Sequence, residues 1–469
     1  MKKAISLLCV FALLCGCFGL AAYAARPGDM DADNKITAGD ARTVLRAAVG
    51  LEVLTPEQFA AADADHDNKI TASDARLVLR SAVDLESLDP APISDTFKAG
   101  FIFLHDEESG YDKNFIDAAL DACAELGLER GQFVLRRGVP ESEECYEVAK
   151  ALAEDGCDII FADSFGHEAF LRQAAGEYPN VLFCHAGGTT AHTAGLANFS
   201  NFWASIYEGR YLTGIAAGMK LNEMIKNGEI TADEAKLGFV GAFPYAEVVS
   251  SFTAFFLGAR SVCPTATMEV KHTGMWYDEL EEQRAASQLI TSGCKVLSQF
   301  SDSPGPAKEC AEKGVPIVCY YTKISGISGA DHLLASCKIN WQPYFVFAMR
   351  AAIEGRKLAP DYTGTLASGS VVLNGLNQEC AAPGTFEAIE AARAELITGT
   401  RFVFDTSAFT VNGEHLTEYL ADVDSDDMFT PETQVISGGR FRESEFRSAP
   451  YFDVRIDGIT EDGGWLIFT

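Results

Sequence analysis

Positive charge is scarce in this sequence of 469 residues. It holds 37 lysines and arginines against 67 aspartates and glutamates, which gives a formal net charge of −30. A surface this acidic repels phosphate backbones and anionic lipid headgroups. The composition therefore argues against nucleic-acid binding and leaves cations and neutral polar molecules as ligands.

Signatures of catalysis and of zinc binding are also missing. The chain contains no G-x-S-x-G turn, no H-E-x-x-H helix and no G-x-x-x-x-G-K-[ST] phosphate loop. None of its 13 cysteines forms a C-x-x-C pair, the usual sign of a zinc or redox site. The ten from Cys123 to Cys380 stand singly among apolar residues, which predicts buried free thiols, with one or two disulfides as the alternative. We expect a binding protein and not an enzyme.

Long apolar runs are absent except at the N-terminus. Two lysines precede an apolar run over residues 4–22, and Ala22-Tyr23-Ala24 has the pattern of a signal-peptidase site. This predicts a secretory signal over 1–24 and an exported mature chain without a transmembrane helix. The alternatives are an uncleaved membrane anchor, and a lipoprotein held at the plasma membrane by a diacylglyceryl group on Cys17 of Leu14-Cys15-Gly16-Cys17.

One acidic segment occurs twice, from Asp29 to Asp40 and from Asp63 to Asp74, and both copies continue into A-R-x-V-L-R-x-A-V. Side-chain oxygens fall at positions 1, 3, 5, 9 and 12 of each copy. EF-hand loops use this spacing, together with the backbone carbonyl of position 7, to surround Ca²⁺ with oxygen ligands. The sequence predicts two Ca²⁺ ions, bound by Asp29, Asp31, Asp33, Lys35, Thr37 and Asp40 and by Asp63, Asp65, Asp67, Lys69, Thr71 and Asp74.

The two loops depart from an EF-hand in three ways. Position 6 is Asn34 or Asn68 in place of glycine, and asparagine enters the left-handed backbone region more readily than most residues. Position 12 is aspartate, and only one helix follows each loop. In these features residues 28–88 resemble the type I dockerin, a small all-α module of paired loop–helix repeats. The resemblance implies two calcium ions and a cohesin domain as partner.

Beyond a linker over 89–96, strand-like and helix-like segments alternate. Short apolar runs bounded by Gly, Pro or Asn suit strands that are buried on both faces of a parallel sheet and joined by amphipathic helices. This predicts an α/β domain over 97–469 with two Rossmann-like lobes, the second starting near Lys236, and short strands at 401–405 and 451–456 that complete them. The other predicted strands are 98–104, 132–136, 158–162, 181–185, 236–241, 267–271, 295–300 and 316–320, and the predicted helices are 114–126, 143–154, 167–177, 207–221 and 277–291.

Aromatic and polar residues gather just after these strands. Ligands of open α/β sheets bind beyond the carboxyl ends of the strands. Rings beside a few carboxylates suit a flat heteroaromatic molecule, because the rings stack on it and the carboxylates accept from its N–H groups. The segments concerned are 105–111, 163–166, 243–244, 276–278, 301–304 and 321–323.

From Phe97 onward the chain resembles the basic membrane protein (BMP) family of ABC-transporter solute-binding proteins. The blocks that carry this resemblance include I-I-F-A-D-S-F-G-H (159–167), I-Y-E-G-R-Y-L-T-G-I-A-A-G (206–218), G-F-V-G-A-F-P-Y-A-E-V-V (238–249) and M-W-Y-D (275–278). The resemblance implies a type I periplasmic-binding fold whose two lobes close at a hinge. It also implies a purine base or nucleoside as ligand and an ABC transporter permease as partner.

The same resemblance implies roles for single residues. Tyr111 and Trp276 match aromatic residues that stack on the purine, and Tyr320-Tyr321-Thr322-Lys323 stands where nucleoside-binding members have an acidic residue that grips the ribose. This departure favours a free base such as adenine. The segment 207–211 is expected to be structural, a helix start with a buried ion pair. The predicted ligand-binding residues are Glu108, Tyr111, Ser164, Phe165, Trp276, Asp302 and Tyr321.

Two alternatives to transport stay open. A dockerin could hold the protein on a cohesin-bearing surface as a ligand sensor or trap without a transporter. Dockerins also occur on polysaccharide-degrading enzymes of cellulosomes, so a carbohydrate-active enzyme is a further alternative. Glycoside hydrolysis needs two carboxylates that flank one bond, and Glu108, Asp278 and Asp302 are the candidates.

Overall fold

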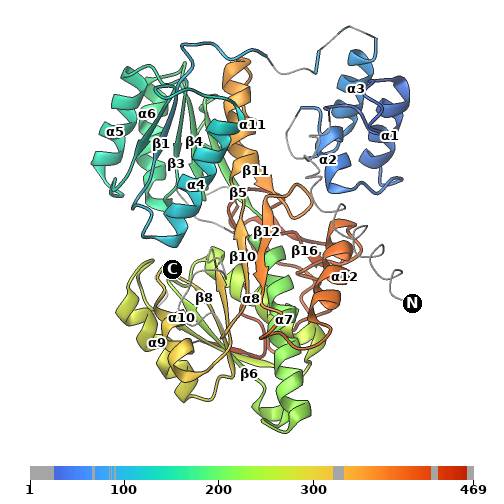
Figure 1. The fold of residues 1–469 in the computed structure, drawn as a ribbon, viewed down its shortest axis with the longest axis vertical. Coiled ribbons are helices and arrows are strands. Elements are labelled where there is room, and N and C mark those ends of the chain that lie inside the picture. The colour runs from blue at the N-terminus through green and yellow to red at the C-terminus, as the bar shows by residue number, and fades with distance from the viewer. Residues whose placement is uncertain are drawn as a thin grey trace, which may run out of the picture. The chain divides into compact units, whose positions relative to one another are not determined.

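The computed structural model describes residues 26–65, 69–83, 85, 87–88, 91–320, 332–423 and 431–461. The chain divides into two compact units, Met1–Asp89 and Pro90–Thr469 (Figure 1). The predicted signal at 1–24 with Cys17, the predicted calcium ligand Asp67 and the predicted ligand-binding Tyr321 lie outside the described residues.

The first unit is helical and follows the sequence repeat. Thr37 and Thr71 cap the helices that leave the two loops, and Asp40 and Asp74 accept hydrogen bonds from the threonine backbone to complete a capping box in each. Val44 and Val78, at matching places in the repeats, are fully buried in a common small core. A further helix lies between the repeats. The elements are α1 (Ala38–Ala48), α2 (Pro56–Ala62) and α3 (Ala72–Ser81).

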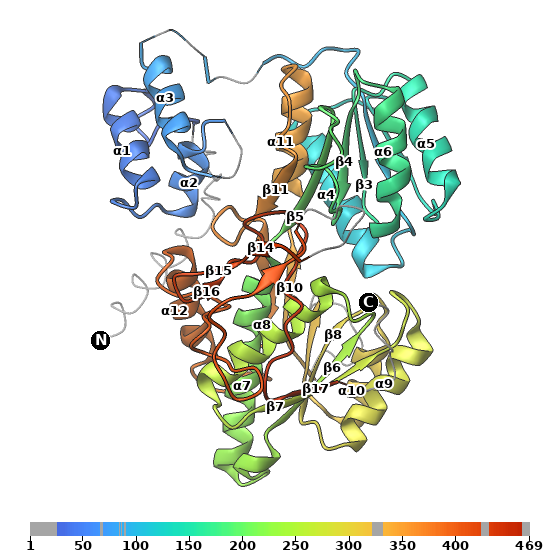
Figure 2. The ribbon, with the colours of Figure 1, turned by 180° about the vertical axis from the view of Figure 1, so that it is seen from behind.

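The second unit begins with a parallel sheet of order β11-β5-β4-β3-β1-β2. Helices cover both faces of this sheet, with α5 and α6 on one side and α4 and α11 on the other (Figures 1 and 2). The elements are β1 (Ala99–Ile102), α4 (Gly110–Glu125), β2 (Phe133–Arg136), α5 (Glu143–Glu154), β3 (Ile159–Ala162), the 3₁₀ turn η1 (Phe165–His167), α6 (Glu168–Glu177), β4 (Leu182–Ala186), β5 (Phe199–Ala204), α11 (Gln342–Ile353) and β11 (Asp361–Gly364).

The second lobe has a sheet of order β12-β10-β9-β8-β6-β7-β17 in which only β12 pairs antiparallel with its neighbour. Its elements are α7 (Ile206–Asn227), η2 (Ala232–Glu234), β6 (Lys236–Gly241), α8 (Ala246–Val262), β7 (Thr267–His272), α9 (Glu279–Thr291), β8 (Val296–Phe300), α10 (Gly305–Lys313), β9 (Ile317–Tyr320), β10 (Leu333–Ile339), β12 (Val371–Leu376), α12 (Thr385–Ile397) and β17 (Ile459–Glu461). Two short ribbons lie outside both sheets, β13 (Leu420–Ala421) with β14 (Thr433–Gln434) and β15 (Ile436–Ser437) with β16 (Arg440–Phe441).

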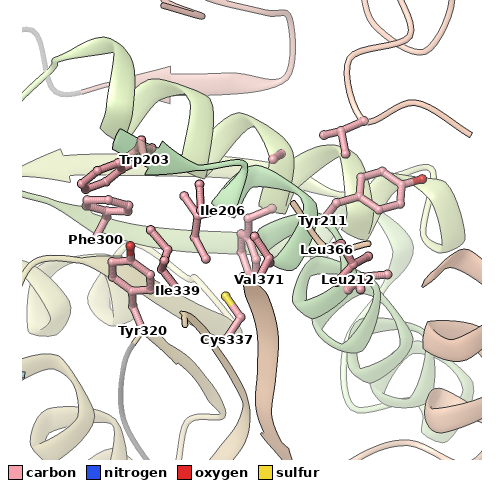
Figure 3. Packing of buried hydrophobic residues seen from close by; sticks show 14 of the residues in the cluster. Trp203, Ile206, Tyr211, Leu212, Phe300, Tyr320, Cys337, Ile339, Leu366 and Val371 are labelled. Carbon is pink, nitrogen blue, oxygen red and sulfur yellow. The ribbon is translucent and has the colours of Figure 1, made fainter. Parts of the chain in front are cut away.

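The chain crosses between the lobes at three places: from β5 to α7, from β10 to α11, and from β11 to β12. Near these crossings Trp203, Ile206, Ile339 and Val371 pack in one buried cluster with residues of the second sheet, among them Phe300 (Figure 3). The crossings therefore pack within the apolar core that is continuous between the two lobes.

Helices α7 and α8 approach each other unusually closely. A Cβ atom on Gly258 would lie 2.0 Å from the carbonyl oxygen of Tyr211, and one on Gly214 would lie 2.1 Å from that of Phe255. Glycine is required at both places because any side chain would collide with backbone. The glycines of L-T-G-I-A-A-G are thus explained by helix packing.

Most of the predicted architecture agrees with this structure. Each of the first eight predicted strands coincides with an observed strand to within a few residues, and the ten cysteines from Cys123 to Cys380 are free and buried as predicted. The second lobe, however, begins at α7 and not near Lys236, because α7 packs on α8 and β10. Within the described residues, no helix combines the length and apolarity needed to cross a membrane.

Two predictions for the second unit are wrong. Residues 401–405 and 451–456 are not strands: Asp405 forms only an isolated bridge with Arg440, and the two segments meet through the rings of Phe404 and Phe452, whose centroids lie 4.2 Å apart. The ion pair expected in 207–211 does not form. The guanidinium of the buried Arg210 lies 4.1 Å from the Tyr320 ring and donates to the Gln299 carbonyl at 2.9 Å.

Candidate ligand cavity and calcium loops

A cavity lies between the two lobes at the carboxyl ends of their strands. It contains about 470 Å³ of empty space, including the part open to solvent, which is within the usual range for small-molecule sites. Both sheets contribute to it, because their parallel strands end on the sides that face each other. The lining residues are Leu104, His105, Tyr111, Asp112, Ser164, Phe165, Ala186, Gly187 and Trp203 from the first lobe and Glu247, Trp276, Phe300 and Asp302 from the second.

Five of the predicted ligand-binding residues line this cavity: Tyr111, Ser164, Phe165, Trp276 and Asp302. Glu108 does not, because it lies in the turn before α4 and its side chain is exposed. One helical turn later, Asp112 is buried and lines the cavity instead. The structure therefore places an acidic group from α4 at the site, but a different one from that predicted.

Aromatic rings form the walls. Trp276 meets Phe243 edge-on at 5.3 Å, and the first lobe's Phe165 stacks on the second lobe's Tyr245 at 6.2 Å. Trp203 and Phe300, which the sequence did not single out, lie beside each other at the inner end of the site (Figure 3). Both lie inside strands, so a search confined to residues after each strand could not have found them.

The first lobe holds its acidic groups in a hydrogen-bond network. Burial acts to raise the pKa of Asp112, but hydrogen bonds from His105 and Ser109 outweigh it and hold the pKa below its usual value. The backbone N–H of His105 donates to Oδ1 of Asp112 at 2.7 Å. Burial raises the pKa of the adjacent Asp163 well above its usual value, and the charge on Asp112 adds to this effect. The surroundings therefore favour the charged form of Asp112 and the protonated form of the neighbouring Asp163.

The second lobe contributes two carboxyl groups, Glu247 and Asp302, whose pKa values are shifted mainly by burial. Burial raises the pKa of Glu247 to about 8, and it raises that of Asp302 well above its usual value, with the charges on Asp112, Glu282 and Glu247 adding to the shift of Asp302. Burial thus favours the protonated form of both groups, and a pKa of about 8 keeps Glu247 largely protonated at pH 7 in the ligand-free protein. Each can donate one hydrogen bond and accept others, which suits a ring with both N–H donors and ring-nitrogen acceptors.

In the first unit, each loop gathers three carboxylates. Ligand oxygens of Asp29, Asp31 and Asp40 lie within 4.8 Å of one another, and those of Asp63, Asp65 and Asp74 do the same. Calcium–oxygen distances are roughly 2.3–2.6 Å, so three oxygens this close can all contact one ion. Four of these carboxylates are buried, and bringing like charges together in a buried place is costly without a cation. The residues present fit Ca²⁺.

The other predicted calcium ligands lie outside these two carboxylate clusters. Asn34 has φ = 65°, the left-handed conformation expected at position 6. Asp33 is exposed, and its carboxylate accepts from the backbone of Lys35 at 2.8 Å. The hydroxyls of Thr37 and Thr71 donate to Asp40 and Asp74 at 2.7 and 3.0 Å. The side chains of Lys35 and Lys69 are exposed, so only their backbone carbonyls remain for the loop interior.

Comparison with known families fits this geometry. Residues 102–360 match the family described as ABC transporter substrate-binding protein PnrA-like, which is more than half of the chain. The chain belongs to this family. Residues 27–81 match the dockerin type I domain. The second unit is therefore a solute-binding domain of an ABC-type transport system, and the first is a dockerin, which together indicate an extracellular or surface protein.

Two relatives carry names that state a ligand. An ABC transporter glucose-binding protein of Haloferax volcanii is 31% identical over 234 residues, 50% of this chain and 55% of the relative. A purine-binding protein of Brucella abortus is 28% identical over 266 residues, 56% of this chain and 71% of the relative. The chain thus spans little more than half the length of the first of these relatives.

Solved structures agree on the fold. A solute-binding protein of an ABC transporter system from Aeropyrum pernix K1 superposes with a TM-score of 0.53 at 17% identity, over 68% of this chain and 94% of that one. One from Conexibacter woesei gives 0.52 at 21% identity, over 65% of this chain and 98% of that one. The solute-binding domain has the fold of periplasmic-binding proteins, as predicted.

The raised pKa of Glu247 predicts a pH-dependent stability. The native state keeps the Glu247 proton up to about pH 8, while the unfolded chain releases it near its ordinary value of 4.5, so stability falls as pH rises between these values. Glu247→Gln cannot ionise and should raise the free energy of unfolding at pH 8 by roughly 1–2 kcal/mol, after allowance for partial exposure, with little change at pH 4.5. Urea unfolding of ligand-free protein at both pH values measures this. Glu312→Gln, on an exposed position of α10, is the control, and an equal gain at both pH values for Glu247→Gln would contradict the prediction.

Proposed function

We propose that this protein captures a purine base or nucleoside between its lobes and delivers it to an ABC transporter permease. The observation that carries the proposal is the cavity between the lobes, where aromatic rings from both lobes enclose a small set of carboxyl groups. A flat heterocycle fills such a space, because rings stack on its faces and carboxyl groups pair with its edge.

The balance of the lining favours a purine over a sugar. Five of the thirteen lining residues are aromatic when His105 is counted with the polar groups: Tyr111, Phe165, Trp203, Trp276 and Phe300. They outnumber the three carboxyl groups and one serine hydroxyl of the lining, which belong to Asp112, Glu247, Asp302 and Ser164. A sugar needs hydrogen-bond partners around its whole edge, whereas a purine needs them at few positions. The Brucella relative is named for purine binding, and the Haloferax relative, named for glucose binding, makes a sugar the second candidate.

Closure of the lobes supplies the mechanism. A ligand that contacts both lobes favours the closed arrangement over the open one, so binding shifts the population toward it. Rings already meet across the cavity, since Phe165 of the first lobe stacks on Tyr245 of the second. The closed protein then presents a surface to the permease that the open one lacks. This role is binding and transfer, without chemical change of the ligand.

We also propose that the dockerin binds two Ca²⁺ ions and docks on a cohesin. Three pairs of apolar residues at matching places in the two repeats are exposed: Leu45 and Leu79, Val49 and Val83, and Leu51 and Leu85. Soluble domains seldom expose such a repeated apolar set without a partner. The protein is exported, either cleaved after Ala24 or lipidated at Cys17, and the dockerin attaches it to a scaffold. If no permease takes part, the same arrangement serves as a tethered sensor or trap.

Ligand identity is tested by calorimetric titration of the mature protein, at fixed calcium, with adenine, guanine, adenosine, inosine and glucose. One purine should bind with micromolar or tighter affinity. Trp276→Ala should weaken it at least about tenfold, since stacking on a base contributes roughly 1–3 kcal/mol. Phe386→Ala, on an exposed face of α12, is the control and should bind normally. Binding of glucose in place of every purine would assign the sugar instead, and binding of none would refute both.

Calcium binding is tested by competition with a fluorescent chelator. The protein should bind two ions, and Asp31→Asn should weaken one of them by at least about tenfold because a charged ligand is lost from a three-carboxylate cluster. Asp31 is exposed, so the exchange does not disturb the core. Asp121→Asn, on an exposed position of α4, should leave both affinities unchanged. A single ion in the unmodified protein would contradict the predicted stoichiometry.

Docking is tested on a surface that carries type I cohesin domains. The protein should bind in calcium and be released by a chelator, and the double variant Val49→Asp with Val83→Asp should reduce binding by at least about a hundredfold, because two charges would enter the apolar interface. Leu420→Asp, exposed on the solute-binding domain, should bind normally. Full binding by the double variant would show that this apolar set is not the docking surface.

A further inference from the structure

The solute-binding domain contains a second cavity that shares no lining residue with the first. It has about 630 Å³ of empty space, including the part open to solvent. The start of α7 contributes Tyr207 and Glu208, and every other lining residue comes from the C-terminal part of the chain, beyond the family match at 102–360. Its function is therefore not implied by the family.

Three arginines line this cavity, in a chain with a formal net charge of −30. Arg440 and Arg442 are two residues apart at the strand β16, so their side chains share one face, while Phe441 between them is buried. Arg401 approaches from the segment after α12, where it donates to Glu395 at 2.6 Å and to the Tyr211 hydroxyl at 2.7 Å.

Arg440 has donors to spare. Its guanidinium lies 4.4 Å above the ring of Phe402, which holds it in place. Its nearest carboxylate is that of Glu445 at 3.7 Å, which is too long for a hydrogen bond. Within the described part of the chain its side chain makes no hydrogen bond, so its N–H groups remain available to a ligand.

The acidic residues of the lining do not cancel this charge. Glu445 is shared, because Nε of Arg442 donates to it at 2.6 Å while Arg440 lies near it. Glu208 accepts from Ser205 and from the backbone of Leu366, and burial raises its pKa. Glu443 is only 4% exposed, and burial raises its pKa to about 7. Burial therefore acts against the negative charge of two of the three carboxyl groups, Glu208 and Glu443.

We propose that this cavity binds a small oxyanion, the carboxylate or phosphate group of a second ligand. Arginine guanidinium groups match the paired oxygens of both anions, and such charge-assisted hydrogen bonds are among the strong ones. A cavity of this size accommodates a whole small molecule as well as the anionic group. The site shares no lining residue with the cavity between the lobes.

The experiment is calorimetric titration of the full mature protein with inorganic phosphate, pyrophosphate and citrate at constant ionic strength in chloride. At least one probe should bind saturably at one site per chain. The double variant Arg440→Gln with Arg442→Gln should lose at least about tenfold in affinity for it while it binds the purine normally. Binding of citrate alone would identify a carboxylate ligand, and binding of phosphate or pyrophosphate alone a phosphate ligand.

The matched control is Arg284→Gln with Arg356→Gln, which removes the same charge from two arginines that each pair with one carboxylate outside the cavity. If the Arg440 and Arg442 double variant fails to fold, Arg440→Gln alone serves, because it breaks no hydrogen bond within the described residues. Absence of saturable binding by all three probes would overturn the proposal. So would an equal loss in the control, since that would mean that only net charge matters.

Discussion

The three chain crossings between the lobes are the constraint on which the rest of this domain depends. Each is fixed by backbone hydrogen bonds to a neighbour: Ser205 donates to Gly364 at 2.8 Å, and Asn340 donates to Ser370 at 2.7 Å. Because the strands of both sheets end at this hinge side, the same constraint makes their carboxyl ends face one another and creates the cavity.

The cavity buries several carboxyl groups, so their protonation states decide which hydrogen bonds they can form with a ligand. The aromatic walls exclude water, and this is why Glu247 and Asp302 hold their protons above the usual pH range. The pKa of Asp112 is not raised by its burial, because His105 and Ser109 donate hydrogen bonds to its carboxylate. In the proposed complex, hydrogen bonds from the ligand to Glu247 and Asp302 take the place of those to the water that closure displaces. In that complex the polar groups pair with the edge of the ligand, while the rings supply most of the buried area.

The sequence predicted those strands that are plain apolar runs, and it failed where polar residues are buried inside a strand. In β5, Asn201 is fully buried and its side chain accepts from the backbone of Ala191 at 2.7 Å, so the pattern F-S-N-F-W-A does not read as a buried strand. In β10, Lys338 donates to Asn114 at 3.1 Å and interrupts the apolar run in the same way. Such partners are distant in sequence, so the hydrogen bonds that permit the burial could not be foreseen.

The site was predictable to a similar degree. The rule that ligands bind after parallel strands located Tyr111, Ser164, Phe165, Trp276 and Asp302 at one cavity. It could not choose between Glu108 and Asp112, because the N-cap at Ser109 decides which acidic residue turns inward, and both choices satisfy the sequence pattern. The dockerin loops were easier to predict from the sequence, because the candidate calcium ligands lie at fixed spacings along one short segment and need no distant partner.

The C-terminal segment links the second cavity to the hinge. The carboxylate of Asp361, in β11, accepts from the backbone and hydroxyl of Ser448 at 2.8 and 2.7 Å, and the Tyr207 hydroxyl donates to the Glu443 carbonyl at 3.2 Å. Glu208, which lines the arginine cavity, accepts from Leu366 in the third crossing. Whatever displaces Glu208 during lobe closure also changes the arginine cavity. If lobe closure moves Glu208, linkage then requires that an anion bound there and a ligand bound between the lobes change each other's affinity by the same factor.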